Sequence, residues 1–296
     1  MLFYDLAALG AATCWALSSI IGATPSRQLG SFGFTRVRLS LLTLLLGGIA
    51  LASGGWQLLN ASQLALLAAS GLTGIFLGDT LMFAAMNRIG PRRTGLLFAT
   101  HSVFSVSLGV LLLSERLSLA AAAGSLLVFA GVLCAIAFGR RDSQQHHWEH
   151  SHGLKLGVAL ALTAALCQAL GTFLAKPVMA AGIDPIAANG LRIAVSCAAH
   201  WLLWASGNRH ARLQSPLAPR LFGQTVLNGL VGQGVGMTLV MLALKGGNVA
   251  TVGILTAMTP VLILPMLWAV MGQRPPALAW LGAAASVAGS MLIVLR

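Results

Sequence analysis

Ten apolar segments, each of about 20 residues, run along the chain and constrain its fold more than any other feature. A helix rises about 1.5 Å per residue, so each segment is long enough to cross the hydrocarbon core of a bilayer. Charged residues make up only 8% of the 296 residues, whereas soluble domains contain roughly 25%. The chain is therefore predicted to be an all-α integral membrane protein. The segments cover residues 4–22, 34–53, 63–86, 94–113, 118–138, 155–175, 186–206, 221–244, 249–271 and 277–295.

The two halves of the chain resemble each other when one is shifted against the other by 158 residues. The matched glycines are Gly74, Gly78, Gly124 and Gly131, which fall on Gly232, Gly236, Gly282 and Gly289. Nearer the start of each half the offset is 154 residues, so that Arg38 falls on Arg192. We therefore predict a duplication, with repeats at 1–138 and 155–296 joined by a polar linker at 139–154.

Each repeat contains five predicted helices, and this odd number places the two repeats in opposite orientations across the membrane. The predicted fold is thus ten transmembrane helices built as a five-helix inverted repeat (5+5), an arrangement typical of secondary transporters. The side that carries the N-terminus receives five Lys and Arg residues, and the other side receives 13. Because cytoplasmic loops are enriched in Lys and Arg, both termini are predicted outside the cell (inner) membrane and the linker in the cytoplasm.

The net charge of +12 does not indicate a nucleic-acid partner, because the basic residues lie in short loops between the helices. The predicted partners are the lipid bilayer and a small-molecule substrate. The linker contains clustered histidines that could bind a metal, but neither a cysteine nor a second cluster accompanies them, so a solvated linker is favoured. We predict no metal site and no cofactor. The linker residues concerned are His146, His147, Glu149, His150 and His152.

One acidic residue, Asp79, lies in the middle of the third apolar segment. It precedes Gly90, the expected turn of a helical hairpin, by 11 residues, and His101 follows Gly90 by 11 residues, so both are expected at a similar depth. Ionisable residues within membrane helices usually face a cavity or a partner. Asp79 is a candidate for coupling transport to protons or for binding a substrate amine. Alternatively it holds helices together through Thr80, His101 or a backbone amide. The matching position in the second half is Met237, which favours a coupling site that is needed only once.

Two repeat-related arginines, Arg38 and Arg192, lie a few residues inside their predicted helices. The planar guanidinium group suits a substrate carboxylate. The alternative is a side chain that extends to the membrane interface or caps backbone carbonyls. Further polar or amphipathic side chains within the apolar segments are candidates for lining a cavity or for hydrogen bonding between helices. They are Trp15, Gln168, Asn228 and Gln233.

Glycine strings, GLTGIFLG at 71–78 and GLVGQGVG at 229–236, predict close packing of helices, because small residues let helix backbones approach each other. The seven-residue glycine spacing in the fifth and tenth helices predicts that these helices pack together, either within one molecule or in a homo-oligomer.

Helix-end motifs in both halves resemble those of the drug/metabolite transporter superfamily, specifically its EamA-type group. In that group each half ends with a turn containing Glu-Arg and then a helix with spaced glycines. LLLSERLSLAAAAGSLLVFAGVL at 111–133 and WAVMGQRPPALAWLGAAASVAGSML at 268–292 follow this pattern, with Gln273 in place of the second Glu. MTPVLILP at 258–265 supplies the proline usual in second copies, while the first copy has Ser102 at the equivalent place.

The resemblance implies a secondary carrier that moves small organic molecules through a cavity between the halves, as exporters of amino acids, drugs or other metabolites do. We expect proton coupling through Asp79. A carrier of phosphorylated or nucleotide-linked metabolites is the alternative, for which only Arg38 and Arg192 are candidate cations. No G-x-x-x-x-G-K-[ST] motif for ATP binding is present. An intramembrane enzyme would need converging acid, base and nucleophile, and only Asp79 is deep, so we predict no enzyme. A channel or a membrane scaffold is a further alternative.

Overall fold

The computed structural model describes residues 1–57, 59–116, 118–137, 154–271 and 276–294, and within these ranges its regular elements are all helices. The first half contains α1 (Leu2–Leu29), α2 (Ser31–Ala52), α3 (Ala61–Ser70), η1 (Gly71–Asp79), α4 (Thr80–Phe98), α5 (His101–Leu113) and α6 (Leu119–Ala137). The second half contains α7 (Leu154–Ala180), α8 (Pro185–Ala205), η4 (Arg209–Ala211), α9 (Pro219–Asn228), η5 (Gly229–Gly236), α10 (Met237–Gly246), α11 (Val249–Thr256), α12 (Thr259–Met271) and α13 (Ala277–Val294).

Seven of the helical stretches are long and apolar enough to cross a membrane, and three shorter apolar helices accompany them among the described residues. The seven are Leu2–Leu29, Ser31–Ala52, Ala61–Gly90, Leu154–Ala180, Pro185–Ala205, Pro219–Gly246 and Val249–Met266. The shorter ones are His101–Leu113, Leu119–Cys134 and Ala277–Ile293. Leu44, Leu111 and Leu126 project outward from α2, α5 and α6, as lipid-facing side chains do. The all-helical membrane fold is confirmed, and the count of ten spans in a 5+5 arrangement stays a prediction.

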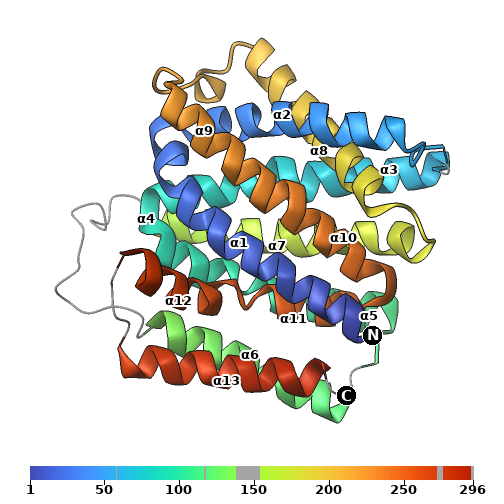
Figure 1. Ribbon diagram of the computed structural model, residues 1–296, viewed down its shortest axis with the longest axis vertical. Coiled ribbons are helices and arrows are strands. Elements are labelled where there is room, and N and C mark those ends of the chain that lie inside the picture. The colour runs from blue at the N-terminus through green and yellow to red at the C-terminus, as the bar shows by residue number, and fades with distance from the viewer. Residues whose placement is uncertain (58, 117, 138–153, 272–275, 295–296) are drawn as a thin grey trace.

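The expected turn at Gly90 is present, because this residue adopts φ 81° and ψ 160° between two helical stretches of α4. A positive φ of this kind is open to glycine at little steric cost. The start of α1 and the end of α13 lie at the same end of the bundle (Figure 1).

Two of the expected helices are not continuous. The segment 94–113 breaks at Ala99 and Thr100, and the segment 249–271 breaks at the matching Ala257 and Met258. In the second copy Pro260 lies at the start of α12 and, lacking a backbone N–H, suits that position. In the first copy Ser102 takes the place of the proline, and its hydroxyl donates to Ala99 O at 2.9 Å. The break is therefore common to both copies, although only one carries the proline.

Helix α6 lies side by side with α13 in the same molecule (Figure 1). A Cβ on Gly124 would lie 2.6 Å from Gly289 O, and one on Gly131 would lie 2.5 Å from Gly282 O. Only glycine permits such contacts between backbones. The glycine spacing thus serves packing within one chain, and a homo-oligomer stays a prediction.

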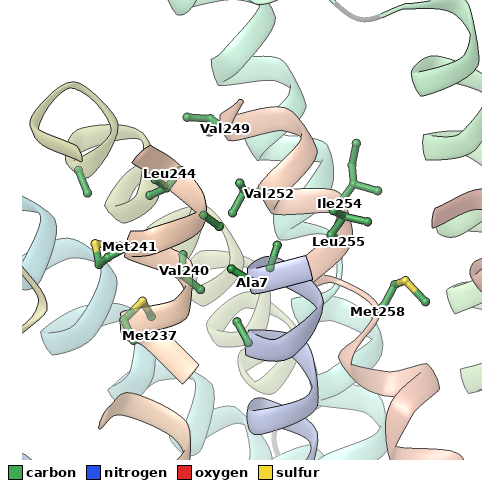
Figure 2. Packing of buried hydrophobic residues seen from close by; sticks show 14 of the residues in the cluster. Ala7, Met237, Val240, Met241, Leu244, Val249, Val252, Ile254, Leu255 and Met258 are labelled. Carbon is green, nitrogen blue, oxygen red and sulfur yellow. The ribbon is translucent and has the colours of Figure 1, made fainter. Parts of the chain in front are cut away.

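The remaining helices pair across the two halves. Helix α1 packs on α9, η5 and α10, while α7 packs on α3, η1 and α4. Helix α2 packs on α8, and α5 packs on α11. Figure 2 shows part of the shared core, where Ala7 of α1 lies beside Val240 of α10 and Leu255 of α11 in one buried apolar cluster. Each half therefore buries its apolar surface largely against the other.

The two glycine strings form π-helical segments, η1 and η5, whose first residues Gly71 and Gly229 are 158 positions apart. A Cβ on Gly71 would lie 2.5 Å from Arg192 O, and one on Gly171 would lie 2.8 Å from the Gly74 Cα. The absence of side chains lets η1 lie directly on α7 and α8. Segments with i→i+5 hydrogen bonds are rare and often occur at functional sites.

Candidate functional site

A buried ion pair joins Arg38 of α2 to Asp79, the last residue of η1. Arg38 Nη2 donates to Asp79 Oδ2, and Gln233 Nε2 of η5 donates to the same oxygen. The side chains of Arg38 and Asp79 are only 3% and 10% exposed. Because Gln233 belongs to the second half, the carboxylate links the two halves in the interior of the bundle.

The remaining contacts of Arg38 fix its guanidinium group. Its Nη1 donates to Asn228 Oδ1 at 3.1 Å. Its Cζ lies 4.9 Å from the ring centroid of Phe83 and 5.3 Å from that of Phe34, within the range of cation–π attraction. The Asn228 amide in turn donates to Ser18 O at 2.7 Å. A chain of polar contacts therefore runs from α2 through the end of α9 to α1.

A second chain of contacts repeats this arrangement around Arg192 of α8. Arg192 Nε donates to Ser70 Oγ at 2.8 Å, and Ser70 Oγ donates to Gly171 O at 2.5 Å. Ser70 and Asn228 are 158 positions apart, and each directly precedes a π-helical segment. We call the set Arg38–Asn228–Ser18 the first bracket and the set Arg192–Ser70–Gly171 the second bracket. Both halves thus keep a hydrogen bond from the buried arginine to the residue before the π-helical segment, but this residue is Asn228 in one case and Ser70 in the other.

The two brackets differ in charge. Arg38 has Asp79 as its partner, whereas the residue matching Asp79 in the second half is Met237. Arg192 is fully buried, with Nη1 contacting Met241 Sδ at 3.5 Å and Nη2 without a hydrogen-bond partner among the residues that the structure describes. Neither arginine extends to a membrane interface, so that interpretation of the sequence is wrong for both. If the two buried arginines are omitted from the count of basic residues, 12 remain on one side and 4 on the other, so the charge bias persists.

Among the described residues the hydrogen bonds of the Asp79 side chain come from Arg38 and Gln233 rather than from His101, whose imidazole contacts other aromatic rings. Its ring centroid lies 5.3 Å from that of Phe98 and 6.5 Å from that of Trp15. The indole of Trp15 donates to Gly232 O at 3.2 Å, on the helix that carries Gln233. Equal spacing from a hairpin turn sets only depth, whereas the direction of a side chain depends on how its helix is rotated.

Gln168 is buried on α7 at 4% exposure. Helix α7 packs on η1, but among the described residues no hydrogen bond joins the Gln168 side chain to Asp79 or to either arginine. The predicted glycines lie at close helix contacts, since a Cβ on Gly78 would meet Cys167 Cβ at 3.4 Å and one on Gly236 would meet Cys14 Cβ at 3.1 Å.

The buried polar residues around Asp79, Arg38, Gln233 and Arg192 are together called the cluster. Two further buried polar residues, which the sequence did not single out, adjoin it. His200 of α8 lies with Nε2 3.3 Å from Thr80 Oγ1, and its ring is 4.7 Å from that of Phe76. Asn189 donates to Gln233 O at 2.8 Å, so it holds the backbone of the residue that binds Asp79. The signal available in the sequence was a polar side chain within an apolar segment, the same signal that identified Asn228.

The Glu-Arg turn has a structural role. Glu115 accepts hydrogen bonds from Val249 N at 2.7 Å and Ala250 N at 3.0 Å, and so caps the start of α11. Lys176 donates to Leu244 O and Gly247 O, at the end of α10. Each charge has the sign that the adjacent helix end favours. Gln273, the counterpart of Glu115, and the linker histidines lie outside the described residues.

Three comparisons place the chain among known proteins. A family model described as "EamA-like transporter family" matches residues 2–137 and 155–295. The chain is 28% identical over 297 aligned positions to a protein of Streptantibioticus cattleyicolor described as a "Probable terminal-alkyne amino-acid exporter", covering 95% of this chain and 93% of that protein. A crystal structure superposes with a TM-score of 0.77 over 99% of this chain and 96% of the other, at 19% identity, which supports the fold alone. The chain is a multi-pass membrane protein that belongs to the EamA-like transporter family.

Proposed function

We propose that this chain is a secondary transporter that exports amino acids or related small organic metabolites by alternating access between two inverted repeats. The observation that carries the proposal is the buried contact of Asp79 with Arg38 from its own half and Gln233 from the other. The similarity to an amino-acid exporter supports the substrate class. A cell (inner) membrane location, with both termini outside, belongs to the same proposal.

The position of this contact suits a coupling role. Any movement of one half against the other must change the hydrogen bond from Gln233 to Asp79 and the one from Arg38 to Asn228, because each joins residues of different halves. Separating a buried ion pair leaves an uncompensated charge, which is unfavourable, so Asp79 requires another cation or a proton whenever Arg38 is displaced. A proton or a substrate ammonium group that reaches Asp79 competes with both donors and thereby biases the movement.

The alternative substrate class, phosphorylated or nucleotide-linked metabolites, is less well supported by the cluster. A phosphate group carries up to two negative charges, and several cations usually surround it. Arg38 and Arg192 are the only cations among the described residues that contact this cluster, and one of them is already paired with Asp79. Enzyme, channel and scaffold functions lack a supporting observation of this kind.

The test is protection of cells against toxic amino-acid analogues and cationic drugs. Wild type is compared with Asp79→Asn at matched amounts of protein in the membrane. Asp184→Asn is the control, because Asp184 accepts a hydrogen bond from Ala187 N at 2.8 Å at the start of α8, where asparagine caps equally well. We expect wild type and the control to protect against amino-acid analogues and Asp79→Asn to fail. Equal protection by all three would rule out coupling through Asp79, and protection by none would contradict export of these compounds.

A further inference from the structure

The two buried arginines present their guanidinium groups in different states. In Arg38 both terminal nitrogens are occupied by oxygen acceptors, Nη1 by Asn228 Oδ1 and Nη2 by Asp79 Oδ2. Within the part of the chain that the structure describes, neither terminal nitrogen of Arg192 has an oxygen acceptor. Its Nη1 faces the Met241 sulfur at 3.5 Å, a weak acceptor, and its Nη2 has no partner among these residues. The strongest contact of the guanidinium group is the one from Nε to Ser70.

The Nη1 and Nη2 atoms of an arginine form the edge of the guanidinium group that usually binds a carboxylate. The two terminal nitrogens of a guanidinium group donate in parallel to the two oxygens of a carboxylate, which is the strongest arrangement open to this side chain. A buried arginine is normally hydrogen-bonded to its counterion. The Asp79 carboxylate lies near enough to attract Arg192, but its hydrogen bonds come from Arg38 and Gln233. The bracket around Arg192 therefore orients a cation whose terminal nitrogens can donate to a carboxylate.

The repeat accounts for this difference between the two arginines. Asp79 fills the corresponding position for Arg38, and its counterpart at Arg192 is Met237, which is 1% exposed. The aromatic ring of Phe83 against Arg38 likewise corresponds to Met241 against Arg192, 158 positions later. One half thus supplies its own carboxylate and the other does not.

Arg192 also lies where the two halves meet. It belongs to α8 of the second half, and its bracket partner Ser70 belongs to the first. The Nη2 atom would lie 3.2 Å from a Cβ on Gly74 of η1, so glycine keeps this side of the guanidinium group free of any side chain from that position. Separation of η1 from α8 during alternating access exposes this edge to the space between the halves.

We propose that Arg192 binds the carboxylate of the transported substrate, which completes on the second half the ion pair that Asp79 makes on the first. The substrate class is accordingly a small metabolite with one carboxylate, as an amino acid has. This inference rests on the proposed function, because it assigns a ligand to the path of transport. With the substrate bound, each guanidinium group has one anionic partner.

The test compares each of three amino acids with its own carboxamide in liposomes that contain the purified protein. L-propargylglycine, L-leucine and L-phenylalanine are used, and each carboxamide keeps the side chain and amine while lacking the negative charge. We expect wild type to transport at least one acid on the order of 10- to 100-fold more efficiently than its amide, the range for a hydrogen-bonded charge. Arg192→Gln should remove the preference, so that the ratio of acid to amide transport falls to about one.

A second variant keeps Arg192 and fills its ligand position from within the chain. Met237→Asp places a carboxylate at the position matching Asp79, where it should pair with Arg192 and abolish the preference for the acid. Met237→Asn, which lacks the charge, is its matched control. Arg36→Gln removes another buried arginine of α2, one that donates to Ala211 O at 2.7 Å outside the cluster, and should keep the preference.

The outcomes separate the two proposals. Transport without a preference for the acid, or a wild-type preference in both Arg192→Gln and Met237→Asp, would overturn the role of Arg192 while leaving a transporter of amines or amides. No transport of any acid or amide by wild type, in liposomes with verified insertion, would overturn the proposed amino-acid export and this inference with it.

Discussion

Gln233 of η5 donates a hydrogen bond to Asp79 of η1, so the two π-helical segments of the two halves meet through one pair of side chains. Neither residue has a counterpart of its own type, because the matching positions are Ile75 and Met237. The contact therefore has no equivalent at the repeat-related positions, whereas each half has a bracket around its buried arginine.

The Arg38–Asp79 pair should behave as a unit in stability measurements. Arg38→Gln alone leaves a buried carboxylate without its cation and should destabilise the protein by about 3 to 5 kcal/mol. Adding Asp79→Asn removes the uncompensated charge and should restore most of that loss. Thermal unfolding in detergent micelles measures both, and a double variant as unstable as the sum of the single variants would contradict the pairing.

Helix α6 should tolerate no side chain at its contact with α13. Gly124→Ala places a Cβ 2.6 Å from Gly289 O, where only backbone movement can relieve the overlap. We expect a loss of about 1 to 3 kcal/mol. Gly48→Ala in α2, where a Cβ meets nothing within 4 Å, should be neutral or slightly stabilising. Equal melting temperatures for the two variants would be incompatible with this packing.

The cap on α11 should depend on the carboxylate of Glu115. Glu115→Ala leaves the N–H groups of Val249 and Ala250 without their acceptors and should destabilise by about 0.5 to 2 kcal/mol. Glu115→Gln keeps one oxygen acceptor and should lose less. The order Glu, Gln, Ala in melting temperature is the expected result, and a Gln variant less stable than the Ala variant would argue against capping.

The break before α5 should accept a proline. Ser102→Pro reproduces Pro260 of the second copy and removes two hydrogen bonds that share the acceptor Ala99 O, one from Ser102 N at 3.2 Å and one from the Ser102 hydroxyl at 2.9 Å. Each hydrogen bond contributes about 1 kcal/mol, and the restriction of the unfolded chain by proline offsets part of this. Val106→Pro, within α5, should instead destabilise by about 3 kcal/mol or more. Similar melting temperatures for the two proline variants would contradict a helix break at this point.

Much of the architecture could be predicted from the residues, because apolar length and glycine spacing act locally. The segments, the turn at Gly90 and the proximity of α6 to α13 follow from such signals. Arg38, Arg192, Asn228 and Gln233 were also identifiable, since a polar side chain in an apolar segment requires a partner. Their roles in transport remain predictions.

The identity of the partners could not be predicted, because it depends on the rotation of each helix about its axis. Spacing places Asp79 and His101 at a similar depth on one hairpin, yet the partners of Asp79 come from α2 and from the other half. Sequence spacing gives depth along a helix, while the packing of α1, α2 and α8 decides which face is turned inward.

The π-helical segments make the site tolerant of a small change in chain length. A turn closed by i→i+5 bonds holds one more residue than an ordinary α-helical turn. Deleting a single residue between Gly71 and Asp79 would let the segment close into a regular α-helix while the residues beyond it keep their orientation, so Asp79 would still face Arg38. A regular α-helix has no such extra residue, and a deletion there turns everything beyond it by roughly 100°. A one-residue deletion in α2 ahead of Arg38 is accordingly more damaging to the site than one in the glycine string.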